Sequence, residues 1–171
     1  MQPTSTPVSS HWEVATHGDD ALSILINDHV AVKEMLIALN EAAPGQREPL
    51  LKRLKLLLTV HNATEENLVY PAIRLLSRHP EESATLYQQT ASADVIVWML
   101  SNLDPADPAF ETNAADLRDA VLEHVRLEEE QEFPALREAA VAEMAKLTAD
   151  VREFRHTFGT IAPPAGITAR G

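Results

Sequence analysis

The feature of this chain that most constrains its fold is a histidine–glutamate motif that occurs twice. The first copy, HNATEENLVYPAIR, runs from His61 to Arg74, and the second, HVRLEEEQEFPALR, runs from His124 to Arg137. The two copies start 63 residues apart, and the segments that precede them match more loosely. A repeat on this scale predicts two helical hairpins built on one plan and packed against each other.

The composition of the chain favours helices over strands. Only 5 of the 171 residues are Gly, aromatic residues make up 5%, and no segment shows sustained apolar–polar alternation. Hydrophobic residues make up 45% of the chain, which is enough for the core of a single domain. We therefore predict an all-α protein, an antiparallel up-down four-helix bundle with a short C-terminal fifth helix.

Proline, glycine and capping residues set the expected helix boundaries. The predicted helices run from after Asp19-Asp20 to about 42, then over about 47–78, 81–103, 108–140 and 141–158. Residues 1–18 are predicted to form an N-terminal arm, 19–158 the bundle, and 159–171 a C-terminal tail. Pro71 and Pro134 lie inside the second and fourth helices, which they should bend just beyond the motif glutamates.

The motif histidines and glutamates are predicted to face the core. Residues four apart on a helix share a face, and the positions at helical spacing around His61 and His124 are mostly apolar. The same spacing surrounds His29 in the first helix with apolar residues. The same helical spacing predicts where other polar side chains lie. Gln131 falls on the inner face, and a solvated acidic surface is predicted for Glu66, Glu129, Glu130 and Glu132.

Such a buried layer needs a partner for its charges. Burying imidazoles and carboxylates without partners costs several kcal/mol each, and Lys33 is the only cation expected to lean inward. The chain has no cysteine, which excludes thiolate sites, whereas imidazole with carboxylate suits iron, manganese or zinc. A glutamate from each of two facing helices can bridge two ions, with an oxo or hydroxo bridge completing the pair. The predicted ligands are His29, His61, Glu65, His124 and Glu128.

These residues resemble the hemerythrin-like, HHE cation-binding family. The resemblance covers about residues 19–158 and rests on the inward His of the first helix and on the doubled motif in register. It implies a four-helix bundle around a non-haem di-iron centre that binds dioxygen or nitric oxide, senses iron or oxygen, or handles peroxide. It also implies the same five residues as the metal ligands.

One member of the family pattern is missing from this chain. The family usually has a His on the third helix, and the internal repeat aligns that position with Ala93, which cannot bind metal. Gln89, one turn earlier on the same face, is a candidate weak ligand. Three outcomes are open: a di-iron site with an extra free position, one tightly and one weakly held ion, or a decayed site.

Three classes of function remain open, and the residues do not decide whether the protein is an enzyme. The first is a di-iron carrier or sensor of dioxygen, nitric oxide or a related small ligand. The second is a peroxide-handling oxidoreductase, which an inward proton donor would favour; the candidates are Thr64, Gln131 and Tyr70, although packing is the preferred role for Tyr70. The third is a metal-poor helical interaction module, in which the motif pairs are intrahelical hydrogen bonds on a half-exposed face.

The acidic charge of the chain limits its partners. Lys and Arg total 14 against 26 Asp and Glu, for a formal net charge of -12, which disfavours binding to nucleic acid or to an anionic membrane. No stretch approaches the roughly 20 apolar residues of a transmembrane helix, and the first residues do not resemble a signal peptide, so we expect a cytoplasmic protein. The remaining histidines, His11, His17, His79 and His156, are expected to lie outside the site.

Overall fold

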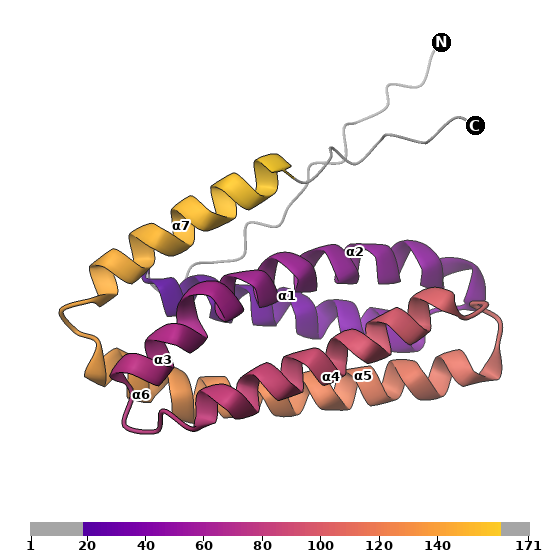
Figure 1. Ribbon diagram of the computed structural model, residues 1–171. Coiled ribbons are helices and arrows are strands. Elements are labelled where there is room, and N and C mark those ends of the chain that lie inside the picture. The colour runs from indigo at the N-terminus through magenta and orange to yellow at the C-terminus, as the bar shows by residue number, and fades with distance from the viewer. Residues whose placement is uncertain (1–18, 162–171) are drawn as a thin grey trace, which may run out of the picture.

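A computed structural model describes residues 19–161 of the protein (Figure 1). These residues form seven α-helices and two short π-helices, labelled η. The elements in chain order are α1 (Ala21–Glu41), α2 (Pro44–Thr64), η1 (Glu65–Val69), α3 (Tyr70–Leu76), α4 (Glu82–Asn102), α5 (Pro108–Leu127), η2 (Glu128–Glu132), α6 (Phe133–Ala139) and α7 (Met144–Ile161). The predicted N-terminal arm, with His11 and His17, lies outside the described residues.

The chain folds into the predicted bundle. Helix α1 packs against α2 and α5, and α4 packs against α5 and α2, so the four long helices form a closed ring (Figure 1). The second and fourth predicted helices each continue through a π-helix into a short α-helix, α3 or α6. Helix α7 is the predicted fifth helix; it lies across α1 and α2 and extends to Ile161, three residues beyond its predicted end.

Local sequence explains where the helices start. The Asp20 side chain accepts a hydrogen bond of 2.8 Å from the Ser23 backbone N–H and so caps α1. Asp107 caps α5 in the same way through the N–H of Ala109, also at 2.8 Å. Pro44 and Pro108 occupy the first turns of α2 and α5, where the missing proline N–H has no helical partner to lose.

The apolar core is divided into two clusters. One fills the end of the bundle near the α1–α2 and α4–α5 connections and includes Leu36, Leu54 and Phe110. The other lies among α1, α3, α6 and α7 and includes Leu22, Ile73 and Phe133. Along α1, His29 falls between Leu25 of the second cluster and Val32 of the first, so the predicted metal ligands form a polar layer between two apolar regions.

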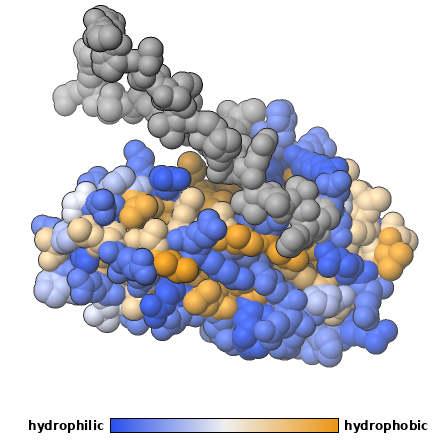
Figure 2. All heavy atoms as spheres, turned by 180° about the vertical axis from the view of Figure 1, so that it is seen from behind, coloured by the Kyte–Doolittle hydropathy of each residue, from blue (hydrophilic) through white to orange (hydrophobic). Residues whose placement is uncertain are grey.

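The face of the molecule opposite to that of Figure 1 is mostly polar. Viewed from behind, hydrophilic side chains surround smaller groups of apolar ones (Figure 2). Within residues 19–161, no helix has both the length and the apolar character that a membrane crossing requires.

Candidate metal centre

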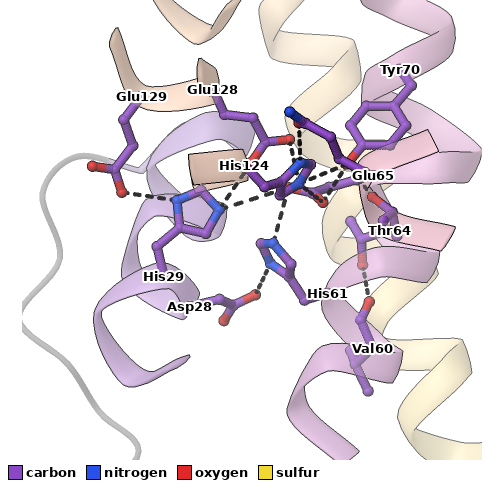
Figure 3. A network of polar contacts seen from close by, with 12 residues as sticks. Asp28, His29, Val60, His61, Thr64, Glu65, Tyr70, His124, Glu128 and Glu129 are labelled. Atoms are coloured by element: carbon purple, nitrogen blue, oxygen red, sulfur yellow. Dashed lines mark hydrogen bonds and ion pairs between the residues drawn. The ribbon is translucent and has the colours of Figure 1, made fainter. Parts of the chain in front are cut away.

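The structure brings all five predicted ligands into one buried layer (Figure 3). Helix α1 supplies His29, α2 supplies His61, and α5 supplies His124, while the first residues of the two π-helices are Glu65 and Glu128. Both glutamates and His29 have no exposed surface, and His61 and His124 are 3% and 8% exposed. The rings of His29 and His61 meet edge to face at 4.8 Å between centroids, and Phe133 stacks on His29.

Each glutamate spreads its two oxygens between different histidines. Glu128 Oε1 lies 3.4 Å from His124 Nε2, and its Oε2 lies 3.2 Å from His29 Nε2. Glu65 Oε1 lies 3.0 Å from His61 Nε2 and 3.8 Å from His29 Nε2, and its Oε2 lies 3.9 Å from His124 Nε2. Both carboxylates therefore stand between His124 on one side and the pair His29 and His61 on the other.

The donor atoms of this layer fit a bound cation. Within this layer, His29 Nε2, Glu65 Oε1 and both carboxylate oxygens of Glu128 are buried without a hydrogen-bond partner. Ligand atoms from His29, His61, Glu65 and Glu128 all lie within 4.8 Å of one another. Native proteins rarely leave so many buried polar atoms unpaired, and a cation shared among them would satisfy all of them. The nitrogen and oxygen donors suit iron, manganese or zinc.

A different side chain holds the outer nitrogen of each histidine. Glu129 Oε1 lies 2.9 Å from His29 Nδ1, and Asp28 Oδ2 lies 3.3 Å from His61 Nδ1. These carboxylates fix Nδ1 as the protonated nitrogen and aim Nε2 at the layer, as metal-binding histidines require. His124 Nδ1 instead lies 3.1 Å from Gln89 Oε1. The Gln89 amide therefore faces the outer nitrogen of His124, which is not the position of a ligand.

Cations hold the two outer carboxylates in turn. Lys33 Nζ lies 3.1 Å from Glu129 Oε1, so the cation expected to lean inward binds the glutamate that anchors His29. Arg155 of α7 binds Asp28 through both carboxylate oxygens, with Nη2 donating to Oδ1 at 3.0 Å and Nη1 donating to Oδ2.

Tyr70 packs in the second apolar cluster, as expected, and its hydroxyl also reaches the same layer. Its buried hydroxyl donates to Glu65 Oε2 at 2.9 Å and lies 3.1 Å from Thr90 Oγ1 and 3.2 Å from His124 Nε2. Ala93 is the position aligned with the missing third-helix histidine. It lies one helical turn after Gln89 and packs at the edge of the first apolar cluster. On the side of His124, the Tyr70 hydroxyl is thus an oxygen donor close to the inner nitrogen, His124 Nε2.

The electrostatics of the metal-free layer follow from this crowding. Burial opposes the charged form of His61, but the Glu65 carboxylate and the Asp28 hydrogen bond outweigh it and raise its pKa to about 9. Burial likewise opposes charge on His29, yet contacts with Glu128, Glu129 and Glu65 raise its pKa well above the usual value. Burial would raise the pKa of Glu65, but His61 and the other imidazoles lower it well below its ordinary value.

The pKa values of Glu128 and Tyr70 are also raised. Burial, together with the neighbouring charge of Glu65, raises the pKa of Glu128. Burial and the carboxylates of Glu65 and Glu128 raise the pKa of Tyr70 well above 10, so its hydroxyl keeps its proton at neutral pH.

Three polar assignments made from helical arithmetic were wrong. Glu129 contacts His29 and Glu132 is 2% exposed, so neither belongs to the solvated acidic surface, whereas Gln131 is exposed although it was predicted to face inward. All three lie in η2, where hydrogen bonds of the i→i+5 type widen the turn and displace residues from the positions that 3.6 residues per turn predicts. The proline inside each motif, Pro71 or Pro134, is the feature of the sequence that could have indicated this change of helical pitch.

Comparison with known proteins agrees with this structure. The family model of the hemerythrin HHE cation binding domain matches residues 20–136. The crystal structure of a hemerythrin HHE cation binding domain-containing protein from Mycobacterium kansasii shares the fold, with a TM-score of 0.69 and 21% sequence identity over 86% of this chain and 94% of that one.

A curated relative shares part of its length with this chain. A DNA nickase from Nostoc sp. is 30% identical over 115 residues, which are 67% of this chain and 32% of the relative. The chain therefore spans about a third of the length of that protein. Because the family model matches more than half of the sequence, including every predicted ligand, the chain belongs to the hemerythrin HHE cation-binding family.

Proposed function

We propose that this protein holds two iron ions in the His/Glu layer and binds a small ligand such as dioxygen or nitric oxide there, as a carrier or sensor. The observation that carries the proposal is the set of buried, unpaired donor atoms on His29, Glu65 and Glu128. Iron would supply the positions at which the small ligand binds, with an oxo or hydroxo bridge between the ions. Manganese and zinc suit the same donors.

The two proposed ion positions would be unequal. One is bounded by His29 and His61 together with Glu65 Oε1 and Glu128 Oε2. The other is bounded by His124 with Glu65 Oε2 and Glu128 Oε1, and the Tyr70 hydroxyl is the further oxygen donor at that side. Because the first position has two imidazoles and the second has one, we propose that the first holds its ion more tightly.

Metal analysis tests this proposal directly. Protein expressed with added iron should contain two irons per chain, as expected for a bundle with two bridging glutamates, and should absorb in the near ultraviolet as oxo-bridged iron does. Stepwise addition of ferrous iron to metal-free protein without oxygen should fill two sites of different affinity. Nitric oxide should then change the spectrum of the iron-loaded protein. Protein with far less than one metal per chain would support the metal-poor interaction module instead.

A peroxide-handling oxidoreductase is the second candidate, and Tyr70 favours it. Of the three inward proton donors expected from the sequence, Gln131 is exposed, and the Thr64 hydroxyl donates to the Val60 carbonyl at 2.7 Å. The Tyr70 hydroxyl lies beside Glu65 and His124, where its proton could be passed to a peroxide oxygen. Release of dioxygen from added peroxide by the iron-loaded protein, lost on Tyr70→Phe while iron content is kept, would favour this enzyme.

The proposed partner is therefore a small molecule. The net charge of -12 makes nucleic acid and anionic membranes unfavourable partners. The activity in the name of the Nostoc relative belongs to a longer protein, of which the matched residues make up 32%, and we do not extend it to this chain.

A further inference from the structure

Helix α7 contacts the metal layer through a chain of two side chains. Its Arg155 binds both oxygens of Asp28, and Asp28 Oδ2 lies 3.3 Å from His61 Nδ1, the contact drawn between Asp28 and His61 in Figure 3. The Asp28 side chain is 13% exposed and that of Arg155 is 22% exposed, so water only partly screens this pair. A guanidinium that binds a carboxylate through two nitrogens fixes the orientation of that carboxylate.

That orientation decides which way His61 faces. An imidazole that donates Nδ1–H to a carboxylate keeps Nε2 free for a metal, and the carboxylate strengthens the nitrogen as a ligand. With Arg155 absent, Asp28 would be free to rotate toward water, and His61 would lose the group that holds its ring.

The other two histidines are anchored differently. His29 has its outer carboxylate, Glu129, held by Lys33 from α1, the helix that also carries His29. His124 faces the neutral amide of Gln89. His61 is thus the histidine whose anchor is held by α7, a helix that begins at Met144, beyond the residues 20–136 that match the family model.

We propose that Arg155 is a positioning residue of the metal centre, through which α7 controls how firmly the ion beside His61 is held. This inference rests on the proposed function, since it concerns the position bounded by His29 and His61. It goes beyond that function because it makes a helix outside the matched family region part of the support of the site.

The test compares variants of two arginines in the same helix. Arg155→Met removes the contact with Asp28, and Arg155→Lys keeps a positive charge without the two-pronged geometry. Arg152→Met is the matched control, because Arg152 is exposed and donates to the backbone carbonyl of Asp19. Asp28→Asn weakens the same contact from the side of α1 and leaves α7 unchanged. Each protein is loaded with iron, and the rate of iron loss to an excess of a ferrous chelator is measured with the absorption spectrum.

Loss of a partner in the outer shell of a metal site typically lowers metal affinity by about 10-fold to 100-fold. We therefore expect Arg155→Met and Asp28→Asn to lose one of the two irons about tenfold faster than the wild type, with a shifted near-ultraviolet band. Arg155→Lys should lie in between, and Arg152→Met should match the wild type. A purely structural role for Arg155 would lower the thermal stability of the metal-free protein without changing the band of the loaded one.

Two results would overturn the inference, and they are distinguishable. Wild-type protein that takes up no iron removes the proposed function and the inference with it. Wild-type protein that holds iron, with Arg155→Met and Asp28→Asn losing it at the rate of Arg152→Met, removes the inference alone and leaves the proposed function standing.

Discussion

Glu129 illustrates how a single side chain can join a metal site without being a ligand. Its Oε1 lies 2.9 Å from His29 Nδ1 and 3.1 Å from Lys33 Nζ. The His29 contact and the Lys33 pair outweigh partial burial and lower the pKa of this carboxyl. Glu130, the next residue, points outward to Arg126 at 2.9 Å. The two adjacent glutamates thus make a matched pair for testing the outer contact.

Glu129→Gln should weaken iron binding by about tenfold, because His29 would lose its charged acceptor. Glu130→Gln should leave iron binding unchanged, because its partner is an exposed arginine. Competition with a chelator of known affinity measures both. Equal affinities in the two variants would show that the Glu129 contact does not support the site.

The two predicted ligand glutamates, Glu65 and Glu128, provide the reference for that measurement. Glu65→Ala and Glu128→Ala should each abolish binding of at least one iron, since each removes a carboxylate that lies between the two proposed ion positions. Glu66→Ala is the control, because Glu66 follows Glu65 directly but is partly exposed. Metal analysis after gel filtration reads the stoichiometry, and full iron content in Glu65→Ala would contradict the proposed site.

At this scale the sequence predicted the inner residues better than the outer ones. Helical spacing alone identified His29, His61 and His124, because apolar neighbours at that spacing reveal a buried position. Asp28 and its partner Arg155 are 127 residues apart, and no periodicity links them. Such outer contacts depend on how helices pack, which the local pattern does not contain.

The π-helices η1 and η2 are the elements that shape the site. Each begins at a predicted ligand glutamate, Glu65 or Glu128, and ends just before the aromatic–proline pair. In a regular α-helix, residues five apart are about 140° apart around the axis, so Glu65 and Tyr70 would point in different directions. The i→i+5 hydrogen bond from Tyr70 N–H to the Glu65 carbonyl closes a wider turn, and their side chains meet at 2.9 Å.

Proline maintains that wide turn. Pro71 has no N–H to donate, so the carbonyl of Glu66, five residues earlier, lacks a helical partner. The hydroxyl of Tyr87 on α4 donates to that carbonyl at 2.6 Å. A bend was predicted at each proline, but the change of pitch before it was not, because helical arithmetic assumes one period throughout.

Pro71→Ala should therefore weaken metal binding, because the restored N–H lets the segment relax toward an ordinary α-helix and turns Tyr70 away from Glu65. Pro49→Ala is the control, since Pro49 is an exposed proline inside α2 and far along the helix from the site. Iron content and thermal stability of the metal-free forms are measured together. Undiminished iron affinity in Pro71→Ala would mean that the wide turn persists without proline.

The cap of α1 has its own test. Partial burial opposes ionisation of Asp20, but hydrogen bonds from Arg137 and Ser23 outweigh it and lower its pKa. Asp20→Ala should lower the free energy of unfolding by about 1 kcal/mol at neutral pH. The stabilisation is present above the unfolded pKa near 3.8 and is lost as pH falls through the lower folded value. Urea unfolding at pH 7 and at acidic pH measures the difference, which should shrink in acid.

At the scale of the whole molecule, the polar layer leaves buried donor atoms without partners, which a bound cation would satisfy. The layer lies between the two apolar clusters, and its unpaired oxygens face one another across the bundle. The four-helix arrangement was predictable because the repeat, the prolines and the caps all agree on it. Unequal ion positions were one of the outcomes that Ala93 left open, but the side chains that would surround each proposed position depend on the direction of each carboxylate oxygen, which the sequence does not give.

In the metal-free protein, protons on His29 and His61 supply part of the positive charge that a metal would bring. His61 has a pKa of about 9 and that of His29 is also raised, so at pH 7 both imidazoles are charged beside Glu65. Raised histidine pKa values stabilise the fold fully below the unfolded value of 6.5, and this contribution is lost as pH rises through about 9. The metal-free protein should therefore melt at a lower temperature at pH 9.5 than at pH 6.5.

Metal binding should show the same protons leaving. A metal requires neutral imidazole, so zinc binding at pH 7 should release protons from His29 and His61. Calorimetric titration in buffers of different ionisation enthalpy counts these protons. The count should fall, and the apparent affinity should rise, as pH increases from 7 to 9, because His61 then loses its proton before the metal arrives. Binding without proton release at pH 7 would mean that the ion does not displace the protons of this layer, and would place the metal elsewhere in the protein.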